Sequence, residues 1–269
     1  MFDALLARIG LDRWPAADVD GLRTLHRAFV SRIPYEDIAV QFGETGDLDE
    51  HALAERVLQD GRGGYCFELN TLFAALLRAA GFVVHHHQSV VGGEGPTNHM
   101  ALVVAVDGET WLADAGLGEG FMEPLPLREG GYERGPLSYT LTREPSGTWW
   151  MGQHEWGSIT GFRMQASPSS LADFEPHHRR LATSPESPFV RTLVVQRPFD
   201  DRIVTLRART LSSVGPSVDT KRVLSRVDFG IVLREVFGIR LSSARLERLW
   251  QRAAAQHEAF MAALANTGH

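Results

Sequence analysis

The chain has 269 residues, of which 43% are hydrophobic and 22% charged, and its net charge is -6. Such a chain buries a large core in two or three subdomains, and its negative charge argues against nucleic acid as a partner. No stretch approaches the ~18–20 apolar residues that span a bilayer, and no secretory signal is visible. The single cysteine, Cys66, excludes an intrachain disulfide. We therefore expect a cytoplasmic protein that binds neither nucleic acid nor a membrane.

Residues 1–82 are expected to be helical. An apolar stripe at helical spacing runs to Ile33, where Pro34 breaks it. A second helix is expected between a cap at Asp49 and a stop near Gly61. These apolar stripes predict the core of a helical bundle.

The only cysteine follows a glycine turn and begins a third helix. Gly63 and Gly64 permit a tight turn before Cys66, and apolar residues at helical spacing then run from Leu69 to Gly81. In the first turn of a helix, unpaired N–H groups and the helix dipole favour a thiolate. A lone cysteine is more often a small core hydrophobe, but the glycine turn at a helix start favours a reactive thiol here.

After Gly81 the pattern becomes that of strands. Residues 83–91 are β-branched at both ends and enclose three consecutive histidines. Only His85 and His87 would share a face of a strand, and neither a cysteine nor a second histidine at helical spacing is nearby. We therefore expect no metal site.

The middle of the chain predicts further short antiparallel strands. Asp107-Gly108 is a hairpin turn between residues 98–106 and 110–114. The glycine-rich loop before this hairpin lacks the Gly-Lys-Ser/Thr ending of a phosphate-binding loop, and no helix follows it. More strands are expected at 137–142, 148–151 and 158–164. This pattern indicates an antiparallel barrel or sandwich.

The last part of the chain mixes strands and helices. A short helix is expected from Leu171, followed by strands at 191–196 and 202–209. Two helices, at 222–237 and 243–265, are expected to end the chain. We interpret this part as a small α/β unit packed on the barrel.

A reactive thiol needs a base, and the base needs an orienting group. His99 lies where a loop meets a strand, and Asp114 ends the strand paired with it. The register of the hairpin brings these two residues nearly opposite each other. The remaining offset of two residues can be accommodated by a bulge or a diagonal pair. Taken separately, His99 would be an ordinary strand residue and Asp114 a turn cap. Together with Cys66 they predict a Cys–His–Asp triad.

At this point the sequence resembles the arylamine N-acetyltransferases. The resemblance rests on residues 33–37, 62–70, 98–99, 114–118 and 183–189, which occur in the family's order across most of residues 20–210. The cysteine motif in residues 62–70 is the specific one. The chain departs from the usual family pattern at four positions, which are Asn98, Ala115, Leu117 and His178.

The resemblance implies an α+β fold with a cysteine-protease-like catalytic core. Its parts would be an N-terminal helical bundle (1–82), a central antiparallel β-barrel (83–196) and a C-terminal α/β lid (197–269). Cys66, His99 and Asp114 would be catalytic. The enzyme would move an acetyl group from acetyl-CoA to an arylamine, arylhydrazine or arylhydroxylamine by a ping-pong mechanism through an acetyl-Cys66 thioester. Acetyl-CoA would be a substrate, with no tightly bound cofactor and no metal.

The resemblance also implies roles for residues around the triad. Tyr35, Leu117 and Phe189 would line the acceptor site as substrate-binding residues. Asn98 and Gly118 would lie on the side where CoA binds. A buried ion pair between Arg62 and Glu36 would hold the cysteine turn in place.

Three other functions are compatible with the same residues. An amide synthase of the same family would release a polyketide chain, and the small side chains of Ala115 and Leu117 would make room for a bulky acyl group. A transglutaminase-like enzyme or cysteine peptidase shares the Cys–His–Asp order but fits the flanking motifs less well. A scaffold without activity would leave the three triad residues without a role.

Overall fold

The helix expected between Asp49 and Gly61 begins and ends where its capping residues predict. The computed structural model describes residues 1–267. The Asp49 carboxylate accepts the N–H of Ala52 at 2.8 Å, and Gly61 ends the same helix in the left-handed conformation with φ 68°. This part contains α1 (Phe2–Arg8), α2 (Val19–Val30), β1 (Tyr35–Glu36), α3 (Ile38–Phe42), α4 (Glu50–Asp60) and α5 (Cys66–Ala79).

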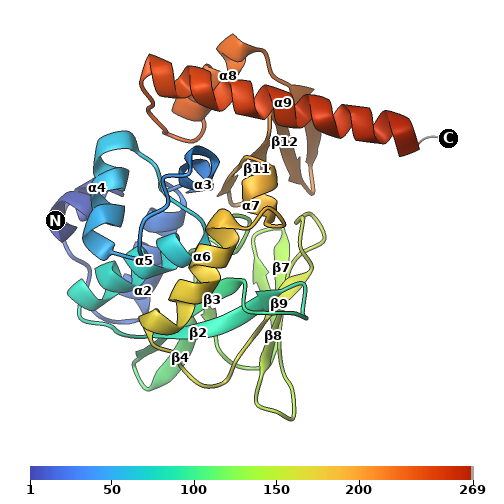
Figure 1. Ribbon diagram of the computed structural model, residues 1–269. Coiled ribbons are helices and arrows are strands. Elements are labelled where there is room, and N and C mark those ends of the chain that lie inside the picture. Colours follow the sequence, from blue (N-terminus) through green and yellow to red (C-terminus); the bar gives the residue numbers. More distant parts are fainter. Residues whose placement is uncertain (268–269) are drawn as a thin grey trace.

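Helix α5 is the centre of the helical part. Its residues are buried without interruption from Cys66 to Leu77, because α2 and α4 cover one side and the strands β2 (Val83–Val91) and β3 (His99–Val106) cover the other. A helix that is apolar on all sides is expected to lie inside a protein. Figure 1 shows α5 between the N-terminal helices and these two strands.

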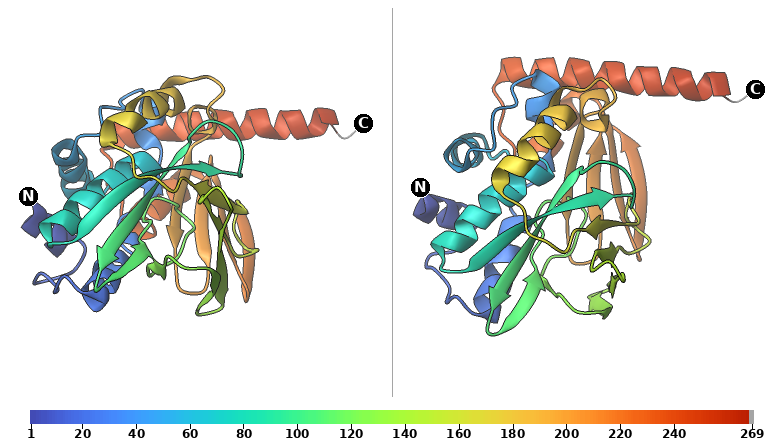
Figure 2. Two further views of the ribbon diagram at one scale, coloured as in Figure 1. Left: turned by 90° about the horizontal axis from the view of Figure 1, so that it is seen from below. Right: turned by 60° about the horizontal axis from the view of Figure 1, so that its bottom comes forward.

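The second part is an antiparallel sheet that curls into a nearly closed barrel (Figure 2). Its strands run in the order β5-β4-β3-β2-β9-β8-β7-β6. The remaining members are β4 (Glu109–Leu112), β5 (Leu125–Pro126), β6 (Gly130–Arg134), β7 (Leu137–Arg143), β8 (Trp149–Gly152) and β9 (Gly161–Met164). The barrel has its own apolar interior, with Tyr139 and Phe162 among its fully buried side chains. The sequence pattern did not indicate the short strands β5 and β6.

The predicted hairpin between β3 and β4 is confirmed. Asp107 and Gly108 have φ angles of 52° and 77°, and Val106 pairs with Glu109 across them. Positive φ at both positions is typical of the turn that matches the twist of two antiparallel strands. This tight turn fixes the register of the whole hairpin.

The third part is a five-stranded sheet with helices on one face. The connection to it contains η1 (Leu171–Phe174), α6 (Glu175–Thr183) and α7 (Pro188–Arg191). The sheet order is β1-β10-β11-β12-β13, with β10 (Val194–Pro198), β11 (Ile203–Arg207), β12 (Thr210–Gly215) and β13 (Val218–Val223). Helices α8 (Arg226–Glu235) and α9 (Ser243–Thr267) pack on it and form a third apolar core. Figure 1 shows α9 crossing the sheet, with its C-terminal end extending beyond the body.

The expected helix at 222–237 is wrong at its beginning. Residues 218–223 form β13, and α8 begins only at Arg226. Strand β13 is an edge strand whose side chains are mostly exposed, so it carries no apolar pattern that its own sequence could reveal. It forms because β12 supplies the complete row of hydrogen-bonding partners.

Strand β1 joins the helical part to the third part of the chain. Tyr35 pairs with Gln196 and Glu36 with Val195, so residues near the N-terminus complete the edge of the five-stranded sheet. Strand β10 also continues past residue 196, the boundary expected between barrel and lid. No helix within residues 1–267 is both long and apolar enough to cross a membrane.

Candidate active site

Cys66 is the first residue of α5, as the glycine turn before it predicts. Its side chain is buried, and its Sγ lies 3.5 Å from the carbonyl oxygen of Asn98, the residue before β3. The carboxylate of Glu68 accepts the N–H of Tyr65 at 3.2 Å and so fixes the residue before the cysteine. Gly116 approaches from the other side, where a Cβ would come within 2.9 Å of the Cys66 Cα. Only glycine fits at that position.

His99 and Asp114 meet as the hairpin predicts. His99 Nε2 donates to Asp114 Oδ2 at 2.5 Å, and both side chains are buried. Val103 pairs with Leu112, so the same register would place Asp114 opposite Ala101, two residues from His99 and on the same face. The two-residue mismatch is thus taken up by a diagonal contact just beyond the end of β4, without a bulge.

Asn70 holds the Asp114 carboxylate, a role that the sequence analysis missed. Asn70 Nδ2 donates to Asp114 Oδ1 at 2.7 Å, and Asn70 Oδ1 accepts the N–H of Ala115 at 3.0 Å. The N–H of Gly116 also donates to Asp114 Oδ1, at 2.8 Å. The signal was present: Asn70 lies one helical turn after Cys66, so both residues face the same neighbour.

Cys66 and His99 line one cavity of about 360 Å³. Because Nε2 of His99 is bound to Asp114, its Nδ1 is the ring nitrogen available to the thiol. Burial alone would lower the pKa of His99, but the Asp114 carboxylate and the adjoining Cys66 raise it to about 10. His99 is therefore protonated at neutral pH, and an imidazolium beside a cysteine favours the thiolate. A helix-borne thiol facing a strand-borne histidine and its carboxylate is the arrangement of a cysteine-protease core.

Four of the five residues expected to bind substrate or CoA line this cavity. Tyr35, Leu117 and Phe189 form apolar walls, and Asn98 lies beside the thiol. The Asn98 side chain accepts the N–H of Val91 at 2.8 Å and so closes the glycine-rich loop. Gly118 is not among the lining residues. It packs behind Tyr35, where a Cβ would come within 2.8 Å of the ring.

The cavity also contains polar side chains that the sequence did not indicate. The buried Glu119 carboxylate accepts the N–H groups of Ser158 at 2.8 Å and Ile159 at 3.0 Å, and the Gln196 amide at 3.2 Å. Burial raises the pKa of Glu119, whereas these hydrogen bonds oppose the rise. Glu119 thereby ties the β8–β9 loop and the lid strand β10 to the loop that follows Asp114. No local pattern could reveal a contact among three such distant segments.

The three consecutive histidines lie in different surroundings. His85 is exposed, and His86 and His87 are buried on β2. His87 Nδ1 lies 2.8 Å from the Gln165 carbonyl, which explains its burial without a ligand. Within residues 1–267 no group of three or more His, Cys, Asp or Glu side chains is arranged to hold a metal ion.

Comparisons with known proteins identify relatives over most of the chain. A family model described as N-acetyltransferase matches residues 18–246. The arylamine N-acetyltransferase / N-hydroxyarylamine O-acetyltransferase of Salmonella typhimurium is 35% identical over 201 residues, which cover 68% of each chain. The structure of the arylamine N-acetyltransferase from Mycobacterium abscessus matches with a TM-score of 0.86 at 29% identity, covering 94% of this chain and 95% of that one. The Mycobacterium marinum arylamine N-acetyltransferase in complex with CoA matches with a TM-score of 0.84 at 25% identity, covering 94% and 98%.

Proposed function

The chain belongs to the arylamine N-acetyltransferase family, and we propose that Cys66 carries the acetyl group between its two substrates. The protein is an acyltransferase that moves an acetyl group from acetyl-CoA to an arylamine. The observation that supports the proposed role of Cys66 is its position: it opens α5 and shares a cavity with His99, which Asp114 holds. Nucleophile, base and orienting carboxylate are thus side chains of the protein, and we expect it to need no tightly bound cofactor.

In the first half-reaction the Cys66 thiolate attacks the carbonyl carbon of acetyl-CoA. A bond forms between the Cys66 sulfur and the acetyl carbon, and the bond from that carbon to the CoA sulfur breaks. The His99 imidazolium gives its proton to the departing CoA thiolate. Backbone N–H groups in the first turn of α5, which have no partner within the helix, would stabilise the oxyanion. One thioester replaces another, so acetyl-Cys66 keeps the reactivity of acetyl-CoA.

In the second half-reaction the amine nitrogen attacks the acetyl-Cys66 carbonyl. A carbon–nitrogen bond forms, the bond from carbon to the Cys66 sulfur breaks, and His99 accepts the proton of the amine. The products are the amide and the original pair of thiolate and imidazolium. Asp114 keeps Nε2 of His99 protonated throughout, so that Nδ1 is the nitrogen that exchanges the proton.

The lining of the cavity supports an aromatic acceptor. Tyr35, Leu117 and Phe189 offer apolar walls close to Cys66, and Asn98 lies on the same side as the thiol. We propose that arylhydrazines and arylhydroxylamines share this acceptor site. We further propose that the chain is organised as a helical bundle, a barrel and a lid, with the whole of β10 belonging to the lid, and that it works in the cytoplasm, where the thiol stays reduced.

Intact-mass spectrometry tests the role of Cys66. The chain mixed with acetyl-CoA should gain the mass of one acetyl group, and an added arylamine should remove it as the amide forms. Cys66→Ser should gain no such mass on the same time scale, whereas Asp219→Asn, a change on the exposed strand β13, should behave as the original chain. Acetylation that persists in Cys66→Ser would refute the proposal. Labelling by a longer acyl thioester but not by acetyl-CoA would instead indicate the amide synthase.

A further inference from the structure

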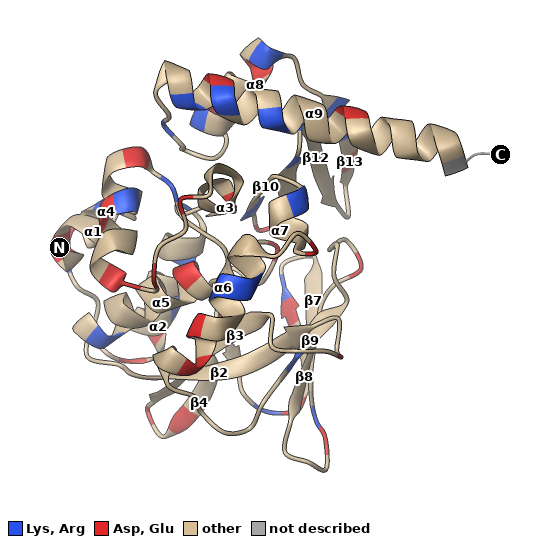
Figure 3. Cartoon of the chain, viewed as in Figure 1, with Lys and Arg blue, Asp and Glu red and all other residues tan. Residues whose placement is uncertain are grey.

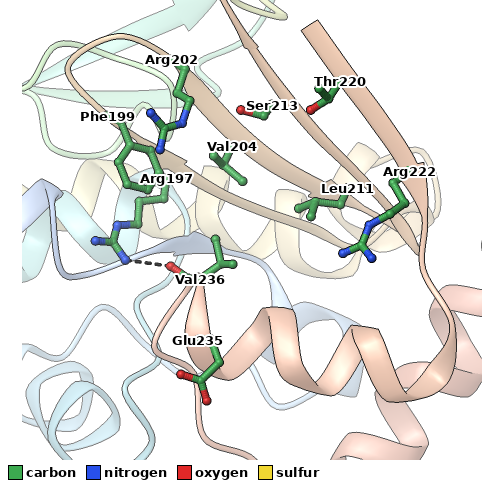
Figure 4. Close-up of a pocket in the computed structure, with 10 residues that line it drawn as sticks. All are labelled: Arg197, Phe199, Arg202, Val204, Leu211, Ser213, Thr220, Arg222, Glu235 and Val236. Carbon is green, nitrogen blue, oxygen red and sulfur yellow. Dashed lines mark hydrogen bonds between the residues drawn. The ribbon is translucent and has the colours of Figure 1, made fainter. Parts of the chain in front are cut away.

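The five-stranded sheet has a second cavity on the face turned away from Cys66 (Figure 4). Its volume is about 530 Å³. Successive residues of a strand point to opposite faces, so Gln196 of β10 lines the catalytic cavity while Arg197 lines this one. The two cavities share no lining residue and are separated by the sheet itself.

A row of residues across four strands forms the floor of this second cavity. Strand register places Arg197, Val204, Ser213 and Thr220 side by side on β10, β11, β12 and β13. Helix α8 ends at Glu235 and leaves this row uncovered. Figure 4 shows the Ser213 and Thr220 hydroxyls in the floor, with Arg197 and Arg202 at one end and Arg222 at the other.

The charged groups that line the cavity are mainly positive. Three arginines and one carboxylate, Glu235, line the cavity, and Glu235 is paired with Arg234 at 2.7 Å. Arg202 also pairs with Asp201 at 2.8 Å, and Arg222 lies 4.0 Å from Asp228, but both pairs are exposed to solvent and therefore weak. Arg197 Nη1 donates to the Val236 carbonyl at 2.7 Å, while its Nε is buried without a partner. The guanidinium carbons of Arg197 and Arg202 lie 5.0 and 4.6 Å from the ring centroid of Phe199, which holds both side chains at the rim.

More unpaired positive charge lies behind Arg197. Within residues 1–267, Arg8, Arg32, Arg197 and Arg240 form no ion pair with any carboxylate. Burial lowers the pKa of Arg197, and the neighbouring Arg32 and Arg8 lower it further. The chain as a whole is negative, and Figure 3 shows acidic and basic segments over all its parts. Of the three arginines that line the cavity, Arg197 alone has no carboxylate partner within residues 1–267, and a bound anion would relieve its repulsion from Arg8 and Arg32.

We propose that this second cavity binds a small phosphate-bearing ligand. Arg202 at one end of the cavity and Arg222 at the other would each bind phosphate oxygens through a planar fork, with the Ser213 and Thr220 hydroxyls donating from the floor between them. Val204, Leu211 and Val236 would contact the apolar part of the ligand. Strand β10 connects this site to the catalytic cavity, but binding itself does not depend on acetyl transfer.

Calorimetric titration of the full chain with pyrophosphate and with ADP tests the proposal. Both should bind at one site at low ionic strength, and ADP should bind more tightly because its nucleoside contacts the apolar wall. Arg202→Gln and Arg222→Gln should each weaken binding about tenfold, since each removes one charge-assisted contact. Arg226→Gln is the matched control: it removes an exposed arginine of α8 that pairs with Glu247, and it should leave binding unchanged.

Two results would overturn the proposal. One is unchanged binding in the double variant Arg202→Gln/Arg222→Gln, which would place the ligand elsewhere, the catalytic cavity included. The other is an equal loss of ligand affinity in Arg226→Gln, which would mean that the ligand is attracted by the general positive charge of this region and not by a specific site. Thermal unfolding and Cys66 acetylation of each variant show that the fold and the catalytic cavity are intact.

Discussion

The guanidinium of Arg62 and the carboxylate of Glu36 face each other in the interior, with Nε 3.3 Å from Oε1 and exposed fractions of 4% and 1%. The pair was expected and is confirmed. It connects the turn before Cys66 to strand β1, which is itself the edge of the lid sheet. One ion pair thus links the nucleophile's turn to the sheet that closes the cavity.

Arg62→Ala should lower the free energy of unfolding by about 3–5 kcal/mol, because Glu36 would remain buried without its partner. Urea unfolding followed by circular dichroism measures the loss. Arg163→Ala is the control, since its pair with Glu144 is about 40% exposed and should contribute less than ~1 kcal/mol. Equal losses of unfolding free energy in the two variants would show that burial does not determine how much the Arg62–Glu36 ion pair contributes to stability.

Asp114→Asn should slow acetylation of Cys66 by roughly 10⁴-fold, because an amide can present its N–H to His99 and so reverse the tautomer. Asn70→Ala should have a smaller effect, since it removes only the groups that hold Asp114. Single-turnover acetylation measured by mass spectrometry gives both rates. A rate for Asp114→Asn within tenfold of the original would remove Asp114 from the proposed triad.

The raised pKa of His99 predicts how stability depends on pH. The folded pKa of about 10 lies above the unfolded value of ~6.5, so the protonated ring favours the folded state. This contribution is complete below pH 6.5 and is lost as the pH rises through about 10. His99→Gln should therefore show a flatter decline of unfolding free energy between pH 7 and 10. Parallel declines in the two proteins would contradict the assignment.

Asp37 predicts a loss of stability in the same direction, which begins at a lower pH. Its buried carboxyl accepts the N–H of Val194 at 3.0 Å through Oδ1, while Oδ2 has no partner, and burial raises its pKa well above the usual value. A raised carboxyl pKa means that stability is lost as the pH rises above ~4.

Asp37→Asn keeps the acceptor for Val194 and removes the buried charge, so it should stabilise the chain by about 1 kcal/mol or more at pH 7. The gain should largely disappear near pH 3, where the carboxyl is mostly neutral in both the folded and the unfolded state. Thermal unfolding at the two pH values measures it. A gain of the same size at both would mean that ionisation of Asp37 is not its cause.

Leu117 predicts a change in acceptor binding. It lines the catalytic cavity together with Tyr35 and Phe189. Leu117→Phe should add an aromatic contact of about 0.5–1.5 kcal/mol and lower the KM for a small arylamine up to tenfold. Acetylation of Cys66 by acetyl-CoA should stay unchanged. Loss of acetylation, or no gain with any arylamine, would show that Leu117 does not face the acceptor.

The sequence alone determined the elements whose signals are local. Asp49 and Gly61 mark the two ends of α4, the glycine turn and the apolar run after it predict that Cys66 begins a buried helix, and Asp107-Gly108 predicts the β3–β4 hairpin. These features depend on capping, helical periodicity and turn geometry, which involve residues close in the chain. The register that this tight turn imposes is enough to predict that His99 and Asp114 meet.

The tertiary structure decided everything that depends on distant segments. The pairing of β1 with β10, the strand state of residues 218–223 and the contact of Glu119 with Ser158 and Gln196 follow from partners far away in the sequence. Gly118 was expected at the CoA side but packs behind Tyr35, because the loop after Asp114 turns against β1. A residue's own neighbours determine its local conformation, but which residues line a cavity depends on how separate segments pack around it.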